Sequence, residues 1–217
     1  MLTESVTKKR LFLSAAILFL ILLIDQWSKW WVKTHMYLGE DFRVLGDWFH
    51  IHFTENYGMA FGLEFGGSAG KFFLSGFRIL ASCAIGWYIV KLARENAPVS
   101  TVISFTLILA GAIGNIIDSA FYGVLFSDSI DGLATLCPPE GGYAGFLQGR
   151  VVDMLYFPLF SGTFPEWLPF WSGEPFLFFR PVFNIADSSI TIGVIVFLLT
   201  QRKQVEEKQE DSGPIAQ

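Results

Sequence analysis

The sequence predicts an all-α membrane protein with four transmembrane helices, a small β-sheet and an interfacial segment on the outer face. Two observations favour this fold class. Hydrophobic residues make up 52% of the 217 residues and charged residues only 16%, whereas soluble domains carry about 25% charged residues. Four apolar segments also approach the roughly 20 residues that a helix needs to cross a bilayer. These segments lie near residues 11–31, 72–90, 99–122 and 181–200.

Basic residues near the ends of these segments predict the topology. Three clusters fall on one side of the membrane if the chain crosses it four times: Lys8 to Arg10, Lys91 with Arg94, and Arg202 with Lys203. The positive-inside rule places such clusters in the cytoplasm. We therefore expect both termini to be cytoplasmic and the two long loops, residues 32–71 and 123–180, to face outward.

The domain organisation follows from these segments. We predict a single four-helix domain over residues 1–200 and a polar cytoplasmic tail over residues 201–217. The first segment could also be a signal peptide, but it runs from Leu11 directly into Asp25 and Lys29 without a cleavage site of small residues, so we interpret it as a retained helix. The net charge of −5 and the lack of a basic face give no indication of nucleic-acid binding.

The outer loops show two further patterns. Phe49, Ile51 and Phe53 alternate with polar residues, which predicts a half-buried strand in a small sheet on the outer leaflet. Residues 157–179 are rich in Phe, Trp and Pro, and because the prolines interrupt any long helix, we expect this stretch to rest in the membrane interface.

Two aspartates beside apolar segments raise the question of function. Asp153 and Asp187 both border membrane-length sequence, where a carboxylate is costly unless it has a partner or a role. A pair of such groups at one membrane face suggests acid–base chemistry on a substrate held in the bilayer, although a structural role is also possible.

Other polar residues follow helical spacing. Asp25 and Lys29 are four positions apart, so they can form an ion pair, or Asp25 can brace a group that faces the substrate. Asn115 and Asp118 are three positions apart beside two glycines, which fits either helix packing or a site. Asn184 repeats this spacing with Asp187, and two such elements near one surface favour a site.

Two further features leave alternatives open. Arg78 lies about 10 Å inside the second segment at 1.5 Å per residue, where it can reach the outer interface along its aliphatic stem or pair with a carboxylate. His50 and His52 share a strand face in a pattern compatible with a metal, but with one other histidine in the chain we predict no metal site. The two cysteines form neither a disulfide framework nor a zinc site.

Five motif blocks occur in an order that resembles the lipoprotein signal peptidases, or signal peptidase II. The blocks are Asp25-Gln26-x-x-Lys29, Asn56-x-Gly58-x-Ala60-Phe61, Gly114-Asn115-x-x-Asp118, Val151-Val152-Asp153 and Phe183-Asn184-x-Ala186-Asp187-Ser188. Together with the four segments, they extend the resemblance over roughly residues 10 to 200. One block alone would be weak evidence, whereas five in order are specific.

The resemblance implies a function and a set of site residues. The family is a group of bacterial inner-membrane aspartyl endopeptidases that remove the signal peptide of prolipoproteins just before a cysteine carrying diacylglycerol. Asp153 and Asp187 match its catalytic dyad, and the outer sheet resembles its interfacial cradle. Residues that match substrate-binding or supporting positions are Asn56, Gly58, Asn115, Asp118, Asn184, Ala186, Asp25 and Lys29.

The implied localisation is the bacterial cell inner membrane, with the active site near the outer, periplasmic face. The partners expected are lipid-modified prolipoproteins and membrane phospholipid, and we expect a monomer without cofactors.

The chain departs from the family pattern in two places. The family usually has an arginine directly after the aspartate that matches Asp118, and here this residue is Ser119. A polar contact to the substrate or to the dyad region is therefore either lost or supplied by another arginine such as Arg150 or Arg180. The stretch from about 125 to 147 is an insertion between Asp118 and Asp153. Neither departure replaces a residue of the dyad.

A proton-coupled carrier is the competing hypothesis, because intramembrane carboxylates are common in transporters. In that case Asp118 and Asp187 would be proton relays. The sequence shows no inverted repeat, and its carboxylates gather at one face rather than at the midplane.

Overall fold

A computed structural model describes residues 2–56, 67–178 and 181–211, and the chain divides into two compact units. Unit 1 comprises residues 1–26, 72–117 and 185–217, and unit 2 comprises residues 27–71 and 118–184. The helical segments dominate unit 1, whereas unit 2 holds every strand of the described residues.

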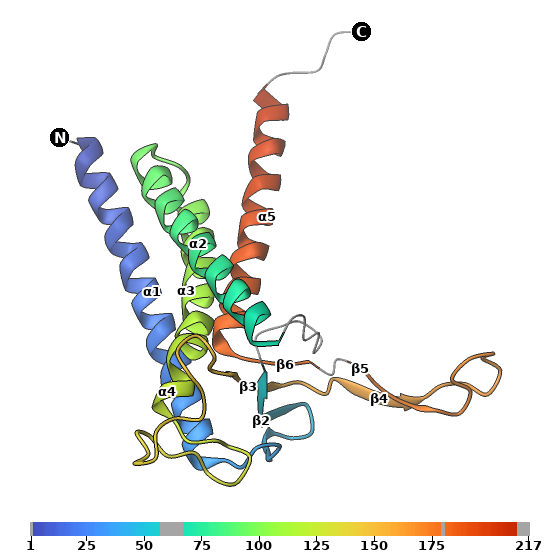
Figure 1. Cartoon of the computed structure of the whole chain (residues 1–217). Coiled ribbons are helices and arrows are strands. Elements are labelled where there is room, and N and C mark those ends of the chain that lie inside the picture. Colours follow the sequence, from blue (N-terminus) through green and yellow to red (C-terminus); the bar gives the residue numbers. More distant parts are fainter. Residues whose placement is uncertain (1, 57–66, 179–180, 212–217) are drawn as a thin grey trace. The chain divides into compact units, whose positions relative to one another are not determined.

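Four long helices confirm the predicted fold class (Figure 1). They are α1 (Leu2–His35), α2 (Gly67–Arg94), α3 (Val99–Ile117) and α5 (Ile185–Asp211). All four contain stretches long and apolar enough to cross a membrane. The last helix begins at Ile185 rather than at Pro181, because Val182–Phe183 form a short strand, β6.

The helices expose large apolar side chains, as lipid-facing helices do. Phe12 on α1, Phe73 and Trp87 on α2, and Leu198 on α5 are all more than half exposed. Water would disfavour so much exposed apolar surface, whereas lipid tails cover it without cost. This exposure agrees with a multi-pass membrane protein.

Unit 1 has its own apolar core between α2 and α3. Ile89 and Leu92 of α2 pack with Val102 and Leu109 of α3. Further partly buried residues pack against this cluster, namely Leu18, Ile85, Tyr88, Ala97, Phe105 and Ile113.

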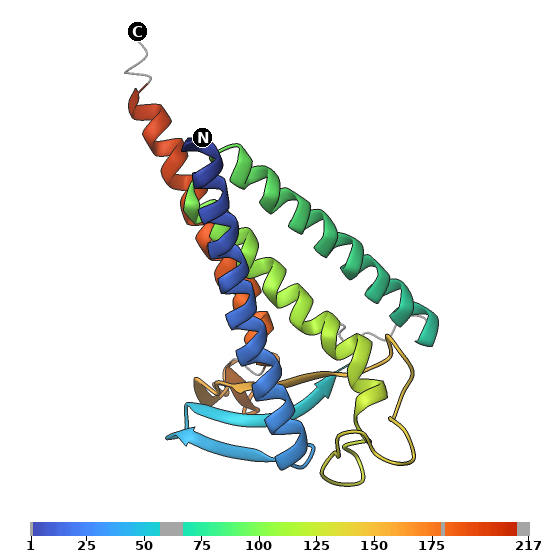
Figure 2. The same cartoon turned by 90° about the vertical axis from the view of Figure 1, so that its left-hand side faces the viewer.

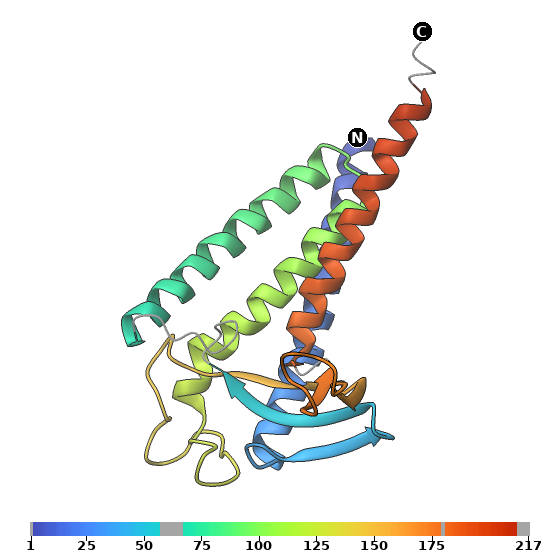
Figure 3. The same ribbon diagram turned by 90° about the vertical axis from the view of Figure 1, so that its right-hand side faces the viewer.

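Helices α3 and α5 lie side by side at a point where small residues meet (Figure 3). A Cβ atom added at Gly111 would lie 2.1 Å from the carbonyl oxygen of Ala186, and one added at Gly114 would lie 3.0 Å from the Ala186 side chain. The two backbones therefore approach so closely that glycine is required on α3. This contact fixes the first turn of α5, the turn that carries Asp187.

Unit 2 contains a four-stranded antiparallel sheet with the strand order β1-β2-β3-β6. Figure 2 shows β1 and β2 as a neighbouring pair of antiparallel strands. The strands are β1 (Asp41–Leu45), β2 (Phe49–Asn56), β3 (Val151–Tyr156) and β6 (Val182–Phe183). The strand predicted around Ile51 is confirmed as β2.

The predicted alternation along β2 is only partly correct. Phe53 is fully buried, but His50 is also buried, whereas Phe49 and Ile51 are half-buried. The pairing with β3 shifts by one residue between Ile51 and Thr54, and such a bulge rotates the side chains that follow it. A strict period of two cannot anticipate that rotation.

The aromatic stretch before α5, for which the sequence predicts no long helix, forms a hairpin. Strands β4 (Phe160–Thr163) and β5 (Pro175–Phe178) pair with each other as a separate two-stranded sheet, which extends away from β3 in Figure 1. Its connecting residues Trp167, Phe170 and Trp171 are more than half exposed.

The chain after α3 passes through a π-helical turn, η2 (Asp118–Tyr122), and a short helix, α4 (Gly123–Leu125). Such turns often occur at functional sites. The end of the insertion packs on η2, since Gly149 donates its backbone N–H to the Ser119 carbonyl at 2.8 Å. A Cβ atom at Gly149 would lie 2.2 Å from the carbonyl oxygen of Asp118.

The close approach of α3 and α5 leads to a stability prediction. Gly111→Ala should lower the free energy of unfolding by about 1–3 kcal/mol, because its methyl group would overlap the Ala186 backbone. Gly76→Ala on α2 is the matched control, since nothing lies within 4 Å of its added Cβ. Thermal unfolding in detergent measures both variants, and equal melting temperatures for the two would contradict the close packing.

Candidate active site

Asp153 lies on β3, and two asparagine side chains hold its carboxylate. Asn184, which follows β6, donates to Oδ1 at 2.8 Å, and Asn56 at the end of β2 donates to Oδ2. The Asn184 amide also donates to the Val152 carbonyl at 3.2 Å. Asp153 is 3% exposed, so its buried oxygens depend on these neutral amide donors.

Asp118 has a different kind of partner, because it forms a fully buried ion pair with Lys29. The Lys29 Nζ lies 2.8 Å from Oδ2 of Asp118, and both side chains are inaccessible to solvent. The same oxygen accepts the backbone N–H of Val152 at 3.3 Å. The ion pair therefore reaches β3 one residue before Asp153.

Asp187 lies in the first turn of α5, where Asn115 of α3 donates to its Oδ1 at 2.8 Å. Its negative charge also acts on Arg78 of α2. This interaction supports the alternative in which Arg78 pairs with a carboxylate rather than only reaching the interface.

Asp25 caps the start of the same helix. Its Oδ1 accepts the backbone N–H of Ala186 at 2.9 Å, and its Oδ2 accepts from Gln26 at 3.1 Å. Free N–H groups and the helix dipole both favour a carboxylate at this position. The contact supports the interpretation of Asp25 as a brace, because Ala186 directly precedes Asp187.

The predicted site residues thus gather in two groups. Unit 2 joins Asp153 with Asn56 and Asn184, and Lys29 with Asp118, while unit 1 joins Asp187 with Asn115, and Asp25 with Ala186. The dyad and the Asp25–Lys29 ion pair stay predictions, since their members belong to different units. Gly58 and Arg180 lie outside the described residues.

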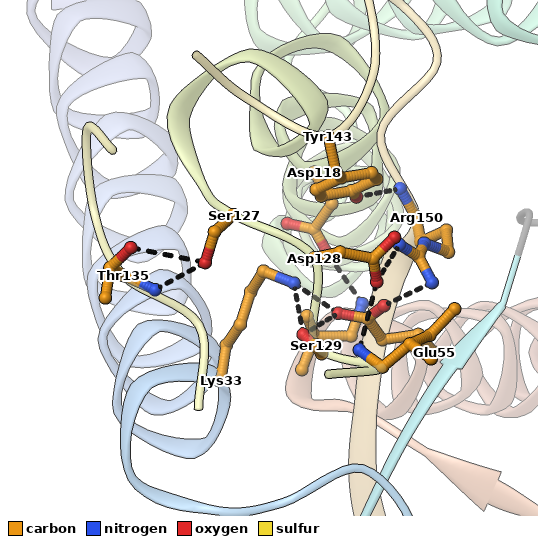
Figure 4. A network of polar contacts seen from close by, with 11 residues as sticks. Lys33, Glu55, Asp118, Ser127, Asp128, Ser129, Thr135, Tyr143 and Arg150 are labelled. Atoms are coloured by element: carbon orange, nitrogen blue, oxygen red, sulfur yellow. Dashed lines mark hydrogen bonds and ion pairs between the residues drawn. The ribbon is translucent and has the colours of Figure 1, made fainter. Parts of the chain in front are cut away.

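A buried ionic network in unit 2 was missed by the sequence analysis (Figure 4). Glu55 of β2 accepts a hydrogen bond from Lys33 of α1 and forms an ion pair with Arg150, whose Nη1 lies 3.2 Å from Glu55 Oε2. Ser129 bridges the network, accepting from Lys33 at 2.8 Å and donating to Glu55 at 3.0 Å. The Glu55 side chain is 1% exposed.

The insertion contributes the other half of this network. Asp128 Oδ1 accepts from Nη2 of Arg150 at 2.7 Å, and the guanidinium lies 4.3 Å from the centre of the Tyr143 ring. The Tyr143 hydroxyl accepts the backbone N–H of Arg150 at 2.6 Å. We name Lys33, Glu55, Asp128, Ser129, Tyr143 and Arg150 the β2–β3 network.

The pKa values in the insertion reflect this environment. Burial would raise the pKa of Asp128, but hydrogen bonds from Arg150 and from the Ile130 backbone outweigh it and lower the pKa. Burial would likewise lower the pKa of Arg150, yet Asp128 and Glu55 raise it. Burial raises the pKa of Tyr143 to about 12, so the three groups stay an anion, a cation and a neutral phenol at neutral pH.

One signal in the sequence could have identified part of this network. Lys33 continues the four-residue spacing of Asp25 and Lys29 along one face of α1. No such signal joins Asp128 to Arg150, because that contact depends on the path of a loop.

The two strand histidines face an acidic side chain. Nδ1 of His50 lies 2.8 Å from Asp41 Oδ1, and Nδ1 of His52 lies 3.4 Å from Oδ2. Among the described residues, no group of three or more His, Cys, Asp or Glu side chains could hold a metal ion.

Comparison with known proteins decides the family. The family model described as signal peptidase (SPase) II matches residues 17–202. The chain belongs to the signal peptidase II family. A lipoprotein signal peptidase of Porphyromonas gingivalis is 53% identical over 192 residues, which cover 88% of this chain and 83% of that protein. One of Amoebophilus asiaticus is 38% identical over 92% of this chain and 81% of its own length.

Solved structures support the same fold. Two structures described as bacterial membrane enzymes match with TM-scores of 0.58 and 0.55 at 24% and 25% identity. They cover 90% and 87% of this chain, and 90% and 91% of their own chains. The predicted function in signal-peptide removal is confirmed at the level of the signal peptidase II family, and nothing in these comparisons supports a carrier.

The buried ion pair gives a prediction about stability. Lys29→Met should lower the free energy of unfolding by about 3–5 kcal/mol, because it removes the cation from a buried carboxylate. Adding Asp118→Asn should restore a large part of this loss, since the asparagine oxygen still accepts the Val152 N–H without a charge. Lys8→Met, which removes an exposed pair with Glu4, should change stability by less than about 1 kcal/mol. Denaturant unfolding compares the variants, and a double variant no more stable than Lys29→Met would refute the charge argument.

The lowered pKa of Asp128 predicts a pH dependence. Because its folded-state pKa is depressed, the stabilisation is fully present above the unfolded pKa of about 3.9 and is lost as the pH falls through the folded pKa. The melting temperature of the parent should therefore fall more steeply below about pH 4 than that of Asp128→Asn. Parallel slopes in thermal unfolding between pH 7 and pH 3 would rule out this contribution.

Proposed function

We propose that the chain is an aspartic endopeptidase that removes the signal peptide from diacylglyceryl-modified prolipoproteins, with Asp153 and Asp187 as its catalytic dyad. Cleavage occurs just before the lipidated cysteine. One observation carries the assignment: Asn184 donates to Asp153 and stands three residues before Asp187, whose carboxylate accepts from Asn115. The dyad residues are thus both oriented by amide side chains from the family motifs.

The chemistry of these donors fits an aspartic mechanism. An ammonium group at 2.8 Å, as in the Lys29–Asp118 pair, strongly favours the ionised form of a carboxylate, and neutral amide donors favour that form less strongly. Amide donors orient Asp153, and in this proposal it exchanges a proton during the reaction. Asp118 instead serves as a structural anion.

The reaction needs one proton shared between the two carboxylates. Like charges at close range cannot both ionise easily, and the dyad titrates as a unit. The ionised member takes a proton from water as the water attacks the scissile carbonyl, and the protonated member donates to the developing oxyanion. When the intermediate collapses, the member that took the proton from water gives it to the leaving amine, and the other member takes back the proton it donated, so the dyad returns to its starting state. No covalent intermediate is needed.

The supporting residues position the dyad through backbone contacts. Asp118 accepts the N–H of Val152, the residue before Asp153, and Asp25 accepts the N–H of Ala186, the residue before Asp187. In this proposal, a second, buried aspartate binds the backbone N–H of the residue that directly precedes each catalytic aspartate.

The membrane placement completes the proposal. Both termini face the cytoplasm, and the active site lies near the periplasmic face of the bacterial inner membrane. The exposed aromatic residues Trp167, Phe170 and Trp171 of the β4–β5 hairpin suit the headgroup region, where phospholipid and the diacylglyceryl group of the substrate meet. The enzyme acts as a monomer, since one chain supplies both aspartates.

The dyad can be tested by isosteric substitution. Asp153→Asn and Asp187→Asn should each lower the cleavage rate of a purified diacylglyceryl-modified prolipoprotein at least about 10³-fold, because an amide cannot exchange the proton. The measurement is the appearance of the cleaved lipoprotein by gel mobility or mass spectrometry.

Two controls make this result interpretable. Asp47→Asn removes an exposed carboxylate and should leave cleavage unchanged. The melting temperatures of both dyad variants should stay near that of the parent, which shows that the fold is retained. Turnover close to the parent rate in either folded dyad variant would exclude the aspartic mechanism.

A further inference from the structure

We propose that Arg150 is a positioning residue for Asp153, and that the insertion exists to hold it. This inference rests on the proposed function, because it assumes that Asp153 is catalytic. It assigns a role to the part of the chain that the family motifs do not cover, residues 126–150.

The β2–β3 ladder has two faces with different side chains. Thr54 pairs with Asp153, Glu55 with Val152, and Asn56 with Val151. Because successive side chains of a strand point to opposite faces, Asn56 and Asp153 share one face, and Glu55 points to the other. The hydrogen bond from Asn56 to Asp153 therefore lies on one face of the strand pair, and the Glu55 ion pairs lie on the opposite face.

Arg150 acts where this ladder ends. It directly precedes Val151, whose pairing with Asn56 is the final one described in the ladder. Arg150 lies two residues before Val152 and thus on the same face as Glu55, where the two side chains form their ion pair at 3.2 Å. This cross-strand pair holds the register at the position from which Asn56 reaches Asp153.

The insertion anchors Arg150 from the other side. Asp128 and Tyr143 contact its side chain and its backbone N–H, as Figure 4 shows. The loop is itself fixed by backbone hydrogen bonds from Tyr143 to Phe126 at 3.0 Å and from Cys137 to Leu125 at 2.7 Å. Arg150 therefore contacts both the loop, which its backbone hydrogen bonds hold in place, and β2, the strand that carries Asn56.

The same segment lies where the family arginine is missing. Ser119 replaces the arginine expected after Asp118, and its carbonyl accepts the N–H of Gly149, the residue before Arg150. The segment that follows the insertion thereby places Arg150 next to Gly149, which packs on the Asp118–Ser119 backbone. Arg150 lies on the face of the sheet that carries Glu55, whereas an arginine at position 119 would lie in η2.

The energetics favour positioning over stability as the role of the network. The network has four charged members, Lys33, Glu55, Asp128 and Arg150, whose charges sum to zero. The free-energy cost of removing these groups from water offsets much of the free energy gained from their mutual attraction. Apolar residues could fill the same volume without that penalty. What an ionic network adds is directional contact that specifies one strand register.

The test separates positioning from folding. With lipidated prolipoprotein as substrate, Arg150→Gln should lower kcat at least about tenfold while KM changes less than about threefold, because a displaced catalytic group slows the chemical step. Arg150→Lys should recover part of kcat, since it keeps the charge but not the planar fork. Asp128→Asn, which leaves the Glu55 ion pair in place, should lower kcat in the same direction by a smaller factor.

Controls decide between the possible outcomes. Arg43→Gln removes an arginine that forms an exposed ion pair with Asp47 at 2.8 Å, and it should leave kcat and KM unchanged. If Arg150→Gln does not fold, the Asp128→Asn result decides. A kcat within about twofold of the parent in the folded variants would overturn the positioning role, as would a loss confined to KM, since displacement acts on the chemical step.

The Asp153→Asn variant, assayed in parallel, distinguishes this failure from that of the proposed function. If Asp153→Asn is inactive and Arg150→Gln is fully active, the proposed dyad is supported and only the positioning role of Arg150 is refuted. If Asp153→Asn is active, the proposed dyad itself is refuted.

Discussion

Buried carboxylates need donors, and most of the polar architecture of this protein follows from meeting that need. An aspartate beside membrane-spanning helices loses its hydration, and each missing contact costs free energy. Asp25 and Asp118 meet the requirement with backbone N–H groups and, for Asp118, with Lys29. Asp153 meets it with two asparagine amides, and the half-buried Asp187 accepts from the Asn115 amide. The glycine contacts of α3 serve the same purpose, because they bring α5 close enough for Asn115 to reach Asp187.

The donors come from different parts of the chain, so each carboxylate also ties elements together. Asp153 joins the end of β2 to the residue after β6, and Asp118 joins α1 to β3. The β2–β3 network repeats this design on the reverse face of the same strands, with Glu55 as the central anion. A single strand pair thus carries the proposed catalytic carboxylate on one face and its support on the other.

The features predicted from sequence are those that depend on local pattern. Length and apolar composition identified the four helices, and the alternation around Ile51 identified β2. The bulge in β2, the π-helical turn at Asp118 and the β2–β3 network were not predictable in this way. Lys33 and Ser129 are 96 positions apart, and only the folded path of the insertion brings them together. The motif blocks located the site residues, but not the donors that hold them.

The acidic side chains differ in the chemical type of their hydrogen-bond donors, and this difference matches their proposed roles. An ammonium partner favours one charge state, so the Lys29–Asp118 pair suits a fixed structural contact. Amide partners favour the ionised form less strongly than an ammonium group does, and both proposed catalytic aspartates accept hydrogen bonds from asparagine amides. The β2–β3 network pairs its cations with Glu55 and Asp128. Because Glu55 points to the face of the strand pair opposite to Asp153, these ion pairs support the position of Asp153 from the far side of the sheet.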